Sequence, residues 1–101
     1  MIYYVDIDET ICRYEGERNY ADAIPIKENI EKMNKLYDQG HTVTYWTARG
    51  SVSMVDYLPL TKSQLVEWGV KHTEVKVGKP HYDLFICDKA INTEDFFNGK
   101  G

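Results

Sequence analysis

Cysteines, excess basic charge and long apolar runs are all missing or scarce in this chain of 101 residues. The two cysteines, Cys12 and Cys87, are too few for a disulfide framework and form no C-x-x-C pair, which argues against structural zinc. Lysine and arginine number 12 against 16 acidic residues, so nucleic acid is not the expected partner. Because no apolar run reaches membrane-spanning length and the first residues lack the features of a signal peptide, we expect a cytoplasmic protein with no membrane partner.

Four short segments rich in β-branched and aromatic residues occur along the chain, and each is typical of a strand buried in a parallel sheet. Helical segments separate them, as expected of an open α/β sheet with right-handed crossovers. The length allows a single domain, residues 1–101, with a parallel four-stranded sheet and flanking helices. The predicted strands are Ile2–Ile7, Thr42–Trp46, Glu74–Val77 and Asp83–Cys87.

Two helices and a flap complete the predicted domain. Pro25 suits a first helical turn, and apolar residues follow it at helical spacing as far as Tyr37. The segment Thr61–Gln64 has the spacing of a capping box and is expected to begin a second helix. The polar stretch Glu9–Tyr20 is predicted to be a loop or a small flap, and the tail beyond Asn92 about one helical turn.

Polar residues gather where the predicted strands end, which is the edge at which open α/β sheets bind ligands. Asp6 and Asp8 end the first strand, Thr47–Arg49 follow the second, and Asp88 follows the fourth. Paired carboxylates rarely end a buried strand without a partner that offsets their repulsion. Since Mg²⁺ bridges carboxylates to a substrate phosphate, the residues predict a magnesium and phosphate site at this edge.

In their order along the chain, these residues resemble the four motifs of the haloacid dehalogenase superfamily. Asp6–Thr10 matches the first motif, D-x-D-x-T after an apolar strand, and Thr47 matches the second, a threonine that closes a strand. Lys79 matches the lysine of the third motif, and Asp88 matches the acidic fourth motif. The resemblance implies a compact Rossmann-like fold and a phosphatase activity that uses Mg²⁺.

A narrower resemblance links the chain to small phosphatases of capsule and lipopolysaccharide biosynthesis. It rests on the segment Gly78–Leu84 and on Ala48 and Arg49 after the second motif. Members often carry two adjacent acids at the fourth motif, where this chain has Cys87 before its acid; in the G-D-x-x-x-D form, Asn92 takes the second acidic position. A second metal-supporting acid is therefore in question.

The intervals between motifs leave no room for the cap domain that usually shapes specificity in this superfamily. We therefore expect a capless enzyme whose site either accepts a bulky substrate or is closed by another subunit. The favoured arrangement is a homo-oligomer in which Arg13–Tyr20 or Ser51–Leu60 of one chain borders the site of its neighbour.

Chemistry and resemblance together suggest a role for each site residue. Asp6 is the predicted nucleophile that forms an aspartyl-phosphate, and Asp8 the general acid and base, a role that needs a pKa raised towards neutrality. Thr47 and Ala48 offer a hydroxyl and backbone amides to a phosphoryl oxygen, and Lys79 holds negative charge beside Asp6.

The metal and the flanking arginine complete the predicted site. Mg²⁺ would be bound by Asp6, Asp88 and the backbone carbonyl of Asp8. Arg49 is predicted with equal weight to bind the phosphate or sugar of the substrate, or to pair with a surface acid. Cys12 and Cys87 are interpreted as small buried residues, with an inhibitory disulfide as the alternative.

The predicted function is hydrolysis of a small phosphate monoester. The subfamily resemblance points to a sugar phosphate in surface-polysaccharide biosynthesis. A non-catalytic phosphate- or metal-binding module of the same fold is the main alternative. A dehalogenase is disfavoured, because Asp8 two residues after the nucleophile points to phosphate esters.

Overall fold

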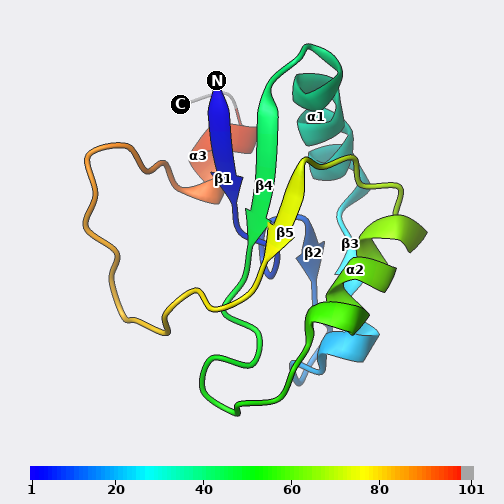
Figure 1. The fold of residues 1–101 in the computed structure, drawn as a ribbon, viewed down its shortest axis with the longest axis vertical. Helices are drawn as coiled ribbons and strands as arrows, with labels where there is room; N and C mark the ends of the chain where they lie inside the picture. Colours follow the sequence, from blue (N-terminus) through cyan, green and yellow to red (C-terminus); the bar gives the residue numbers. More distant parts are fainter. Residues whose placement is uncertain (99–101) are drawn as a thin grey trace.

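The computed structural model describes residues 1–98; the last three residues of the predicted domain, 99–101, lie outside the described residues. Its central sheet has three parallel strands in the order β1 (Ile2–Val5), β4 (Thr42–Trp46) and β5 (Glu74–Lys76), as Figure 1 shows. All three strands were predicted, the first and third slightly longer than observed. A compact α/β domain with a parallel sheet is therefore confirmed.

Two helices pack on the same face of this sheet. Because β4 lies between β1 and β5, both crossovers run in the same direction, and right-handed crossovers place α1 (Lys27–Asp38) and α2 (Leu58–Glu67) on one side. No helix in residues 1–98 is long and apolar enough to span a bilayer. The buried apolar core between sheet and helices consists of Val5, Ile7, Ile11, Cys12, Ile30, Met33, Val43, Tyr45, Leu65 and Val70.

The predicted flap contains a small antiparallel pair of strands. β2 (Cys12–Arg13) pairs with β3 (Ile24–Pro25), and the single turn η1 (Tyr20–Asp22) lies between them. Pro25 therefore ends a strand, and α1 begins two residues later than predicted, at Lys27. The flap carries its aromatic residues back towards the carboxyl edge of the sheet.

The predicted tail helix is present as α3 (Thr93–Phe97), which packs beside β1. Asn92 caps it, since its side-chain oxygen accepts a hydrogen bond from the Glu94 amide at 2.9 Å. The ring of Phe96 packs edge-on against Tyr3 of β1, with 6.4 Å between the ring centroids. The chain after residue 92 is therefore anchored to the sheet.

The fourth predicted strand, Asp83–Cys87, is not formed. Residues 77–92 contain no helix or strand and arch away from the sheet on the side of β1 (Figure 1). Within residues 1–98, β1 pairs only with β4, so its outer edge is free. The burial predicted for this apolar run is therefore wrong: no neighbouring strand in residues 1–98 accepts its hydrogen bonds, and Leu84 and Ile86 are 76% and 89% exposed.

Tyr45 is buried at the centre of β4, and its hydroxyl has no hydrogen-bond partner in residues 1–98. An unpartnered buried hydroxyl costs about 1–3 kcal/mol. We expect Tyr45→Phe to raise the free energy of unfolding by about 1 kcal/mol, seen as a thermal midpoint higher by about 4–8 °C. Tyr3→Phe is the control, because the Tyr3 hydroxyl lies at the surface. A lower midpoint for Tyr45→Phe would show that the hydroxyl is satisfied in solution.

Candidate active site

Asp6 and Lys79 form an ion pair at the carboxyl edge of the sheet. Asp6 follows the last residue of β1, and its Oδ2 lies 3.5 Å from Lys79 Nζ. The lysine is held in place because its amide donates to the Thr47 carbonyl at 3.1 Å and its carbonyl accepts from Ser51 Oγ at 2.6 Å. Since 45% of the Asp6 side chain is exposed, the carboxylate remains accessible to a ligand.

Asp8 points instead to Arg49. The arginine donates from Nη2 to Asp8 Oδ1 at 2.9 Å and from Nε to Asp8 Oδ2 at 3.2 Å, which is a bidentate ion pair. The arginine side chain is completely buried and that of Asp8 is 11% exposed. Of the two roles predicted for Arg49, the structure shows pairing with an acid, but the acid is Asp8 of the site itself and not one at the surface; substrate binding by Arg49 stays a prediction.

Four residues that the sequence analysis did not select hold this ion pair. Arg49 Nη1 donates to Thr61 Oγ1 at 3.2 Å and to the Gln64 side-chain oxygen, both on α2. Tyr14 of the flap donates its hydroxyl to Asp8, and the Tyr20 ring centroid lies 4.8 Å from the guanidinium carbon. The flap and α2 are thus joined through the Arg49 guanidinium.

Thr61 and Gln64 do not form the predicted capping box. α2 begins at Leu58, three residues earlier, and has a proline in its first turn. Both residues therefore lie inside the helix and are buried, at 0% and 5% exposed. A buried threonine and glutamine on one helical face indicate a buried polar partner, which is Arg49.

The pKa of Asp8 lies below its ordinary value. Burial raises it, but hydrogen bonds from Arg49 and Tyr14 and the positive charge of Arg49 outweigh that effect. Burial and the hydrogen bond to Asp8 raise the pKa of Tyr14, which keeps the hydroxyl protonated as a donor. The predicted rise of the Asp8 pKa towards neutrality is wrong for this arrangement: the carboxylate is held ionised, the form that acts as a base.

Thr47 and Ala48 lie between the two ion pairs. The Thr47 amide is not free, because it donates to the Lys76 carbonyl at 3.0 Å, and its hydroxyl accepts from the Arg49 amide at 3.1 Å. The hydroxyl hydrogen can still be donated to a ligand. Ala48 lines the same cavity as Asp6, and its amide donates no hydrogen bond within residues 1–98. Ala48 therefore offers the backbone amide that was expected of both residues.

Gly50 shapes the loop that follows Arg49. Its φ is +83°, and a Cβ there would overlap the Val55 carbonyl oxygen. We expect Gly50→Ala to lower the free energy of unfolding by about 2–3 kcal/mol, from the left-handed backbone and the overlap together. Gly16→Ala is the matched control, since Gly16 has a φ of +79° with nothing near its Cβ position, and should cost about 1 kcal/mol. Equal losses in urea unfolding would contradict the overlap.

Asp88 is not brought to the other acids. It lies in the exposed segment that arches from the sheet, and no group of three or more His, Cys, Asp or Glu side chains within residues 1–98 is placed to hold a metal ion. Asp6 already faces Lys79, and both Asp8 oxygens face Arg49. In this arrangement the residues do not fit the predicted Mg²⁺ site. Asn92 is not available as a substitute ligand, because it caps α3.

The two cysteines differ in exposure. Cys12 is buried under the site, with its Sγ 3.4 Å from Asp8 Oδ1, and burial with the neighbouring Asp8 charge raises the pKa of its thiol to about 12. Cys87 is exposed, so its interpretation as a small buried residue is wrong. In the native protein we expect a disulfide reagent to modify Cys87 quickly and Cys12 only on unfolding. Rapid reaction of two thiols in the native state would contradict the burial of Cys12.

A cavity of about 700 Å³ opens over these residues. Asp6, Asp8, Ala48 and Arg49 form part of its wall. Its volume lies in the range of about 300–1,000 Å³ typical of small-molecule sites. The rest of its lining is mostly polar. It comes from the flap, the loop after β4 and the segment after β5: Glu17, Arg18, Asn19, Tyr20, Gly50, Val52, Ser53, Tyr57 and His81.

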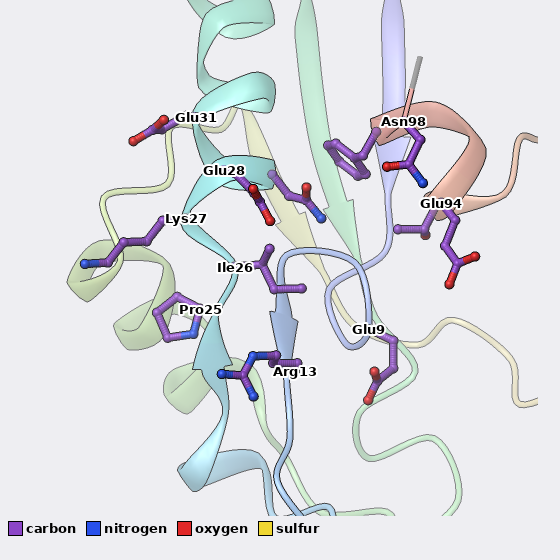
Figure 2. A pocket seen from close by; sticks show the side chains of 12 residues that line it. Glu9, Arg13, Pro25, Ile26, Lys27, Glu28, Glu31, Glu94 and Asn98 are labelled. Atoms are coloured by element: carbon purple, nitrogen blue, oxygen red, sulfur yellow. The ribbon is translucent and has the colours of Figure 1, made fainter. Parts of the chain in front are cut away.

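A second cavity of about 750 Å³ lies between the first turn of α1 and α3, as Figure 2 shows. Glu28 and Glu31 of α1 and Glu94 of α3 border it, together with Glu9 and Arg13 from the flap. None of the predicted site residues lines this hollow. The slightly smaller cavity over Asp6 and Asp8 is therefore the candidate active site.

Comparison with known proteins adds information on the fold. No family model matches the chain, and no curated protein matches it in sequence. The fold is similar to the crystal structure of an MCSG target from Vibrio cholerae, with a TM-score of 0.84 and 24% sequence identity. The similarity covers 95% of this chain and 86% of the other. At that identity it shows a shared compact α/β fold and nothing about function.

Proposed function

We propose that this chain is a phosphomonoesterase of the haloacid dehalogenase type, with Asp6 as nucleophile. The observation that carries the proposal is the placement of Asp6, 3.5 Å from Lys79 Nζ, on a small-molecule cavity that Ala48 also lines, at the carboxyl edge of a parallel sheet. A lysine held against an accessible carboxylate suits a site where a dianionic phosphate must approach an anion. The resemblance of Asp6–Thr10, Thr47 and Lys79 to the superfamily motifs supports the same chemistry.

The reaction runs in two in-line displacements. An Asp6 oxygen attacks phosphorus, the bond from phosphorus to the ester oxygen breaks, and the leaving oxygen takes up a proton. Water then attacks the phosphorus of the aspartyl-phosphate, releasing inorganic phosphate and the Asp6 carboxylate. Lys79 offsets the charge of the phosphoryl oxygens in both steps, and the amide of Ala48 donates to one of them.

Asp8 moves the proton in this scheme. Held ionised by Arg49 and Tyr14, it accepts the proton of the attacking water in the second step. Because Asp8 returns to its ionised form, that proton then passes to solvent, and the leaving oxygen of the first step takes its proton from water. Arg49 positions Asp8 through the bidentate ion pair and is itself held by Thr61 of α2.

The substrate in this proposal is a small sugar phosphate, as the subfamily resemblance suggests. The cavity has room for a ligand of that size, and polar flap residues such as Arg18 and Asn19 line it. The homo-oligomer expected from the lack of a cap stays a prediction, which gel filtration tests. The superfamily resemblance implies Mg²⁺ as well. No step is assigned to the ion, because Asp88 lies apart from Asp6 and Asp8 and the described residues do not fit it.

A non-catalytic phosphate-binding module is the second candidate. It is favoured by the buried pair of Asp8 with Arg49, which leaves the predicted acid without a proton. The two candidates differ in turnover: a binding module retains phosphate, whereas an enzyme releases it from an ester.

The test is release of inorganic phosphate from p-nitrophenyl phosphate and a panel of sugar phosphates by the purified chain. Lys79→Gln removes the charge beside Asp6, and we expect kcat/KM to fall by about 10²–10³-fold. Lys71→Gln is the matched control, because Lys71 forms a surface pair with Asp38 away from the cavity. Equal activity of the wild type and Lys79→Gln would contradict the proposal.

A further inference from the structure

The leaving oxygen of the proposed reaction needs a proton that Asp8 does not supply. When the bond from phosphorus to the ester oxygen breaks, negative charge develops on that oxygen. Asp8 has no proton to give, because Arg49 and Tyr14 hold its carboxylate ionised. Water is a weak acid, so it protonates a strongly basic leaving oxygen, such as that of an alcohol, inefficiently. A side chain that gives a proton at the same cavity would speed this step.

His81 lies on the wall of the cavity that Asp6 and Asp8 also line, and it is exposed to a ligand there. The other two histidines of the chain do not line this cavity. His41 Nδ1 lies 2.7 Å from the N-terminal nitrogen, and His72 Nδ1 lies 3.1 Å from a backbone carbonyl oxygen. His81 therefore supplies the imidazole at the candidate active site.

The backbone on both sides of His81 is held near the Asp6 ion pair. Lys79, whose Nζ lies 3.5 Å from Asp6 Oδ2, donates its amide to the Thr47 carbonyl at 3.1 Å. Tyr82 follows His81 directly, and its ring centroid lies 5.5 Å from Lys79 Nζ. Two residues of chain span at most about 7 Å, so the short tether to Lys79 keeps His81 close to the nucleophile.

Imidazole is the side chain of this cavity best suited to give a proton at neutral pH. A general acid works best when its pKa is near the operating pH, and imidazole ordinarily changes charge between about pH 5 and 8. Arginine does not release its proton, carboxylates are ordinarily ionised, and tyrosine and lysine hold their protons more tightly. The titratable side chains around His81 are Asp6, Asp8, Glu17, Arg18, Tyr20, Arg49 and Tyr57 on the cavity wall, with Lys79 and Tyr82 in its own segment.

We propose that His81 is the general acid of the first step and protonates the leaving oxygen in place of water. The inference rests on the proposed function, because it assigns a role in the same reaction. As an Asp6 oxygen attacks phosphorus, the bond to the ester oxygen breaks and its electron pair stays on that oxygen. The imidazolium of His81 donates its proton there, so the product leaves as a neutral alcohol. The neutral imidazole regains a proton from solvent before the next turnover, and Asp8 keeps its role in the second step.

Two aryl esters that differ in their need for a proton test this role. Phenyl phosphate and p-nitrophenyl phosphate are similar in size, but phenolate is the more basic leaving group. Because kcat/KM reports the steps up to release of the phenol, it isolates the first displacement. We expect His81→Gln to lower kcat/KM by about 10²-fold for phenyl phosphate and by less than about tenfold for p-nitrophenyl phosphate. His72→Gln is the matched control, because His72 lies off the cavity, and should lower neither.

Rescue by imidazole is a second readout that a purely structural role would not produce. His81→Ala removes the ring and leaves space at the cavity wall, where imidazole from solution can enter and donate the same proton. Added imidazole should therefore raise the rate of His81→Ala with phenyl phosphate several-fold. The same addition should leave the rates of wild type and His72→Gln unchanged.

The inference is overturned if His81→Gln loses the same factor on both esters, if it loses nothing on either, or if imidazole leaves the rate of His81→Ala unchanged. In each of these cases the wild type still releases phosphate through Asp6, so the proposed function stands. A wild type that releases no phosphate from either ester overturns the proposed function, and this inference with it.

Discussion

Replacing Asp6 by asparagine is expected to lower phosphate release from p-nitrophenyl phosphate by at least about 10⁴-fold. An amide cannot form the covalent intermediate, and among the described carboxylates that line this cavity Asp6 is the exposed one that is paired with a lysine. The measurement is steady-state release of inorganic phosphate by wild type and Asp6→Asn, purified in parallel. Asp83→Asn is the control, since Asp83 lies in the exposed segment, and should retain wild-type activity.

The loss must come from chemistry and not from unfolding. Asp6 is 45% exposed and its one ion pair is with Lys79, so its replacement should move the thermal midpoint by no more than a few degrees. If Asp6→Asn kept more than about a hundredth of the wild-type rate, the phosphate would be leaving by a route that does not use Asp6.

Replacing Arg49 by glutamine should produce the largest loss of stability in the chain. Asp8 would then remain buried without its cation, and Thr61, Gln64 and Tyr14 would each lose a hydrogen bond. Breaking one side of a buried ion pair costs about 3–5 kcal/mol. Urea unfolding at neutral pH measures the loss. Arg13→Gln is the matched control, because Arg13 forms a surface pair with Glu15, and should change stability very little.

The Arg49 effect should depend on pH in a defined direction. In the wild type the pKa of Asp8 is lowered, so the pair stabilises the fold above the unfolded pKa of about 3.9, and this stabilisation is lost as pH falls through the folded value. In Arg49→Gln, burial without the cation raises the pKa of Asp8, and ionisation destabilises the fold as pH rises. The stability difference should therefore be larger at pH 7 than at pH 4. A constant difference would show that the arginine acts by packing alone.

Much of the fold follows from patterns that are local in sequence. A few neighbouring residues are enough to predict the strand before Asp6, the helix up to Tyr37 and the strand before Thr47. The right-handed crossover rule then places the helices on one face of the sheet. The capping-box spacing at Thr61–Gln64 predicts a later start for α2 than the observed one at Leu58, where Pro59 suits the first helical turn.

The remaining strand shows the limit of such patterns. An apolar run such as Leu84–Ile86 indicates a preference for burial but does not name the surface that buries it. In the structure Leu84 and Ile86 remain exposed. Whether such a run finds a strand partner depends on contacts with residues distant in sequence, which the local pattern does not contain.

The candidate site was predicted unevenly for the same reason. Asp6, Thr47, Ala48 and Lys79 come together because each lies at a strand end, a place that sequence reveals. The role of Arg49 depends on partners that are distant in sequence, 41 residues away at Asp8 and 15 at Gln64. The residues next to Arg49 in the sequence do not reveal that its guanidinium is buried. Because this buried guanidinium binds Asp8, the pKa of Asp8 is lowered and not raised as expected.

The most direct test of the account is to trap the covalent intermediate on Asp6. Enzyme turning over p-nitrophenyl phosphate is quenched with borohydride, which reduces an aspartyl-phosphate to homoserine, and the peptides are sequenced by mass spectrometry. The account predicts homoserine at position 6, only when substrate is present. Unmodified Asp6 in enzyme that is releasing phosphate, or homoserine at position 8 instead, would contradict it.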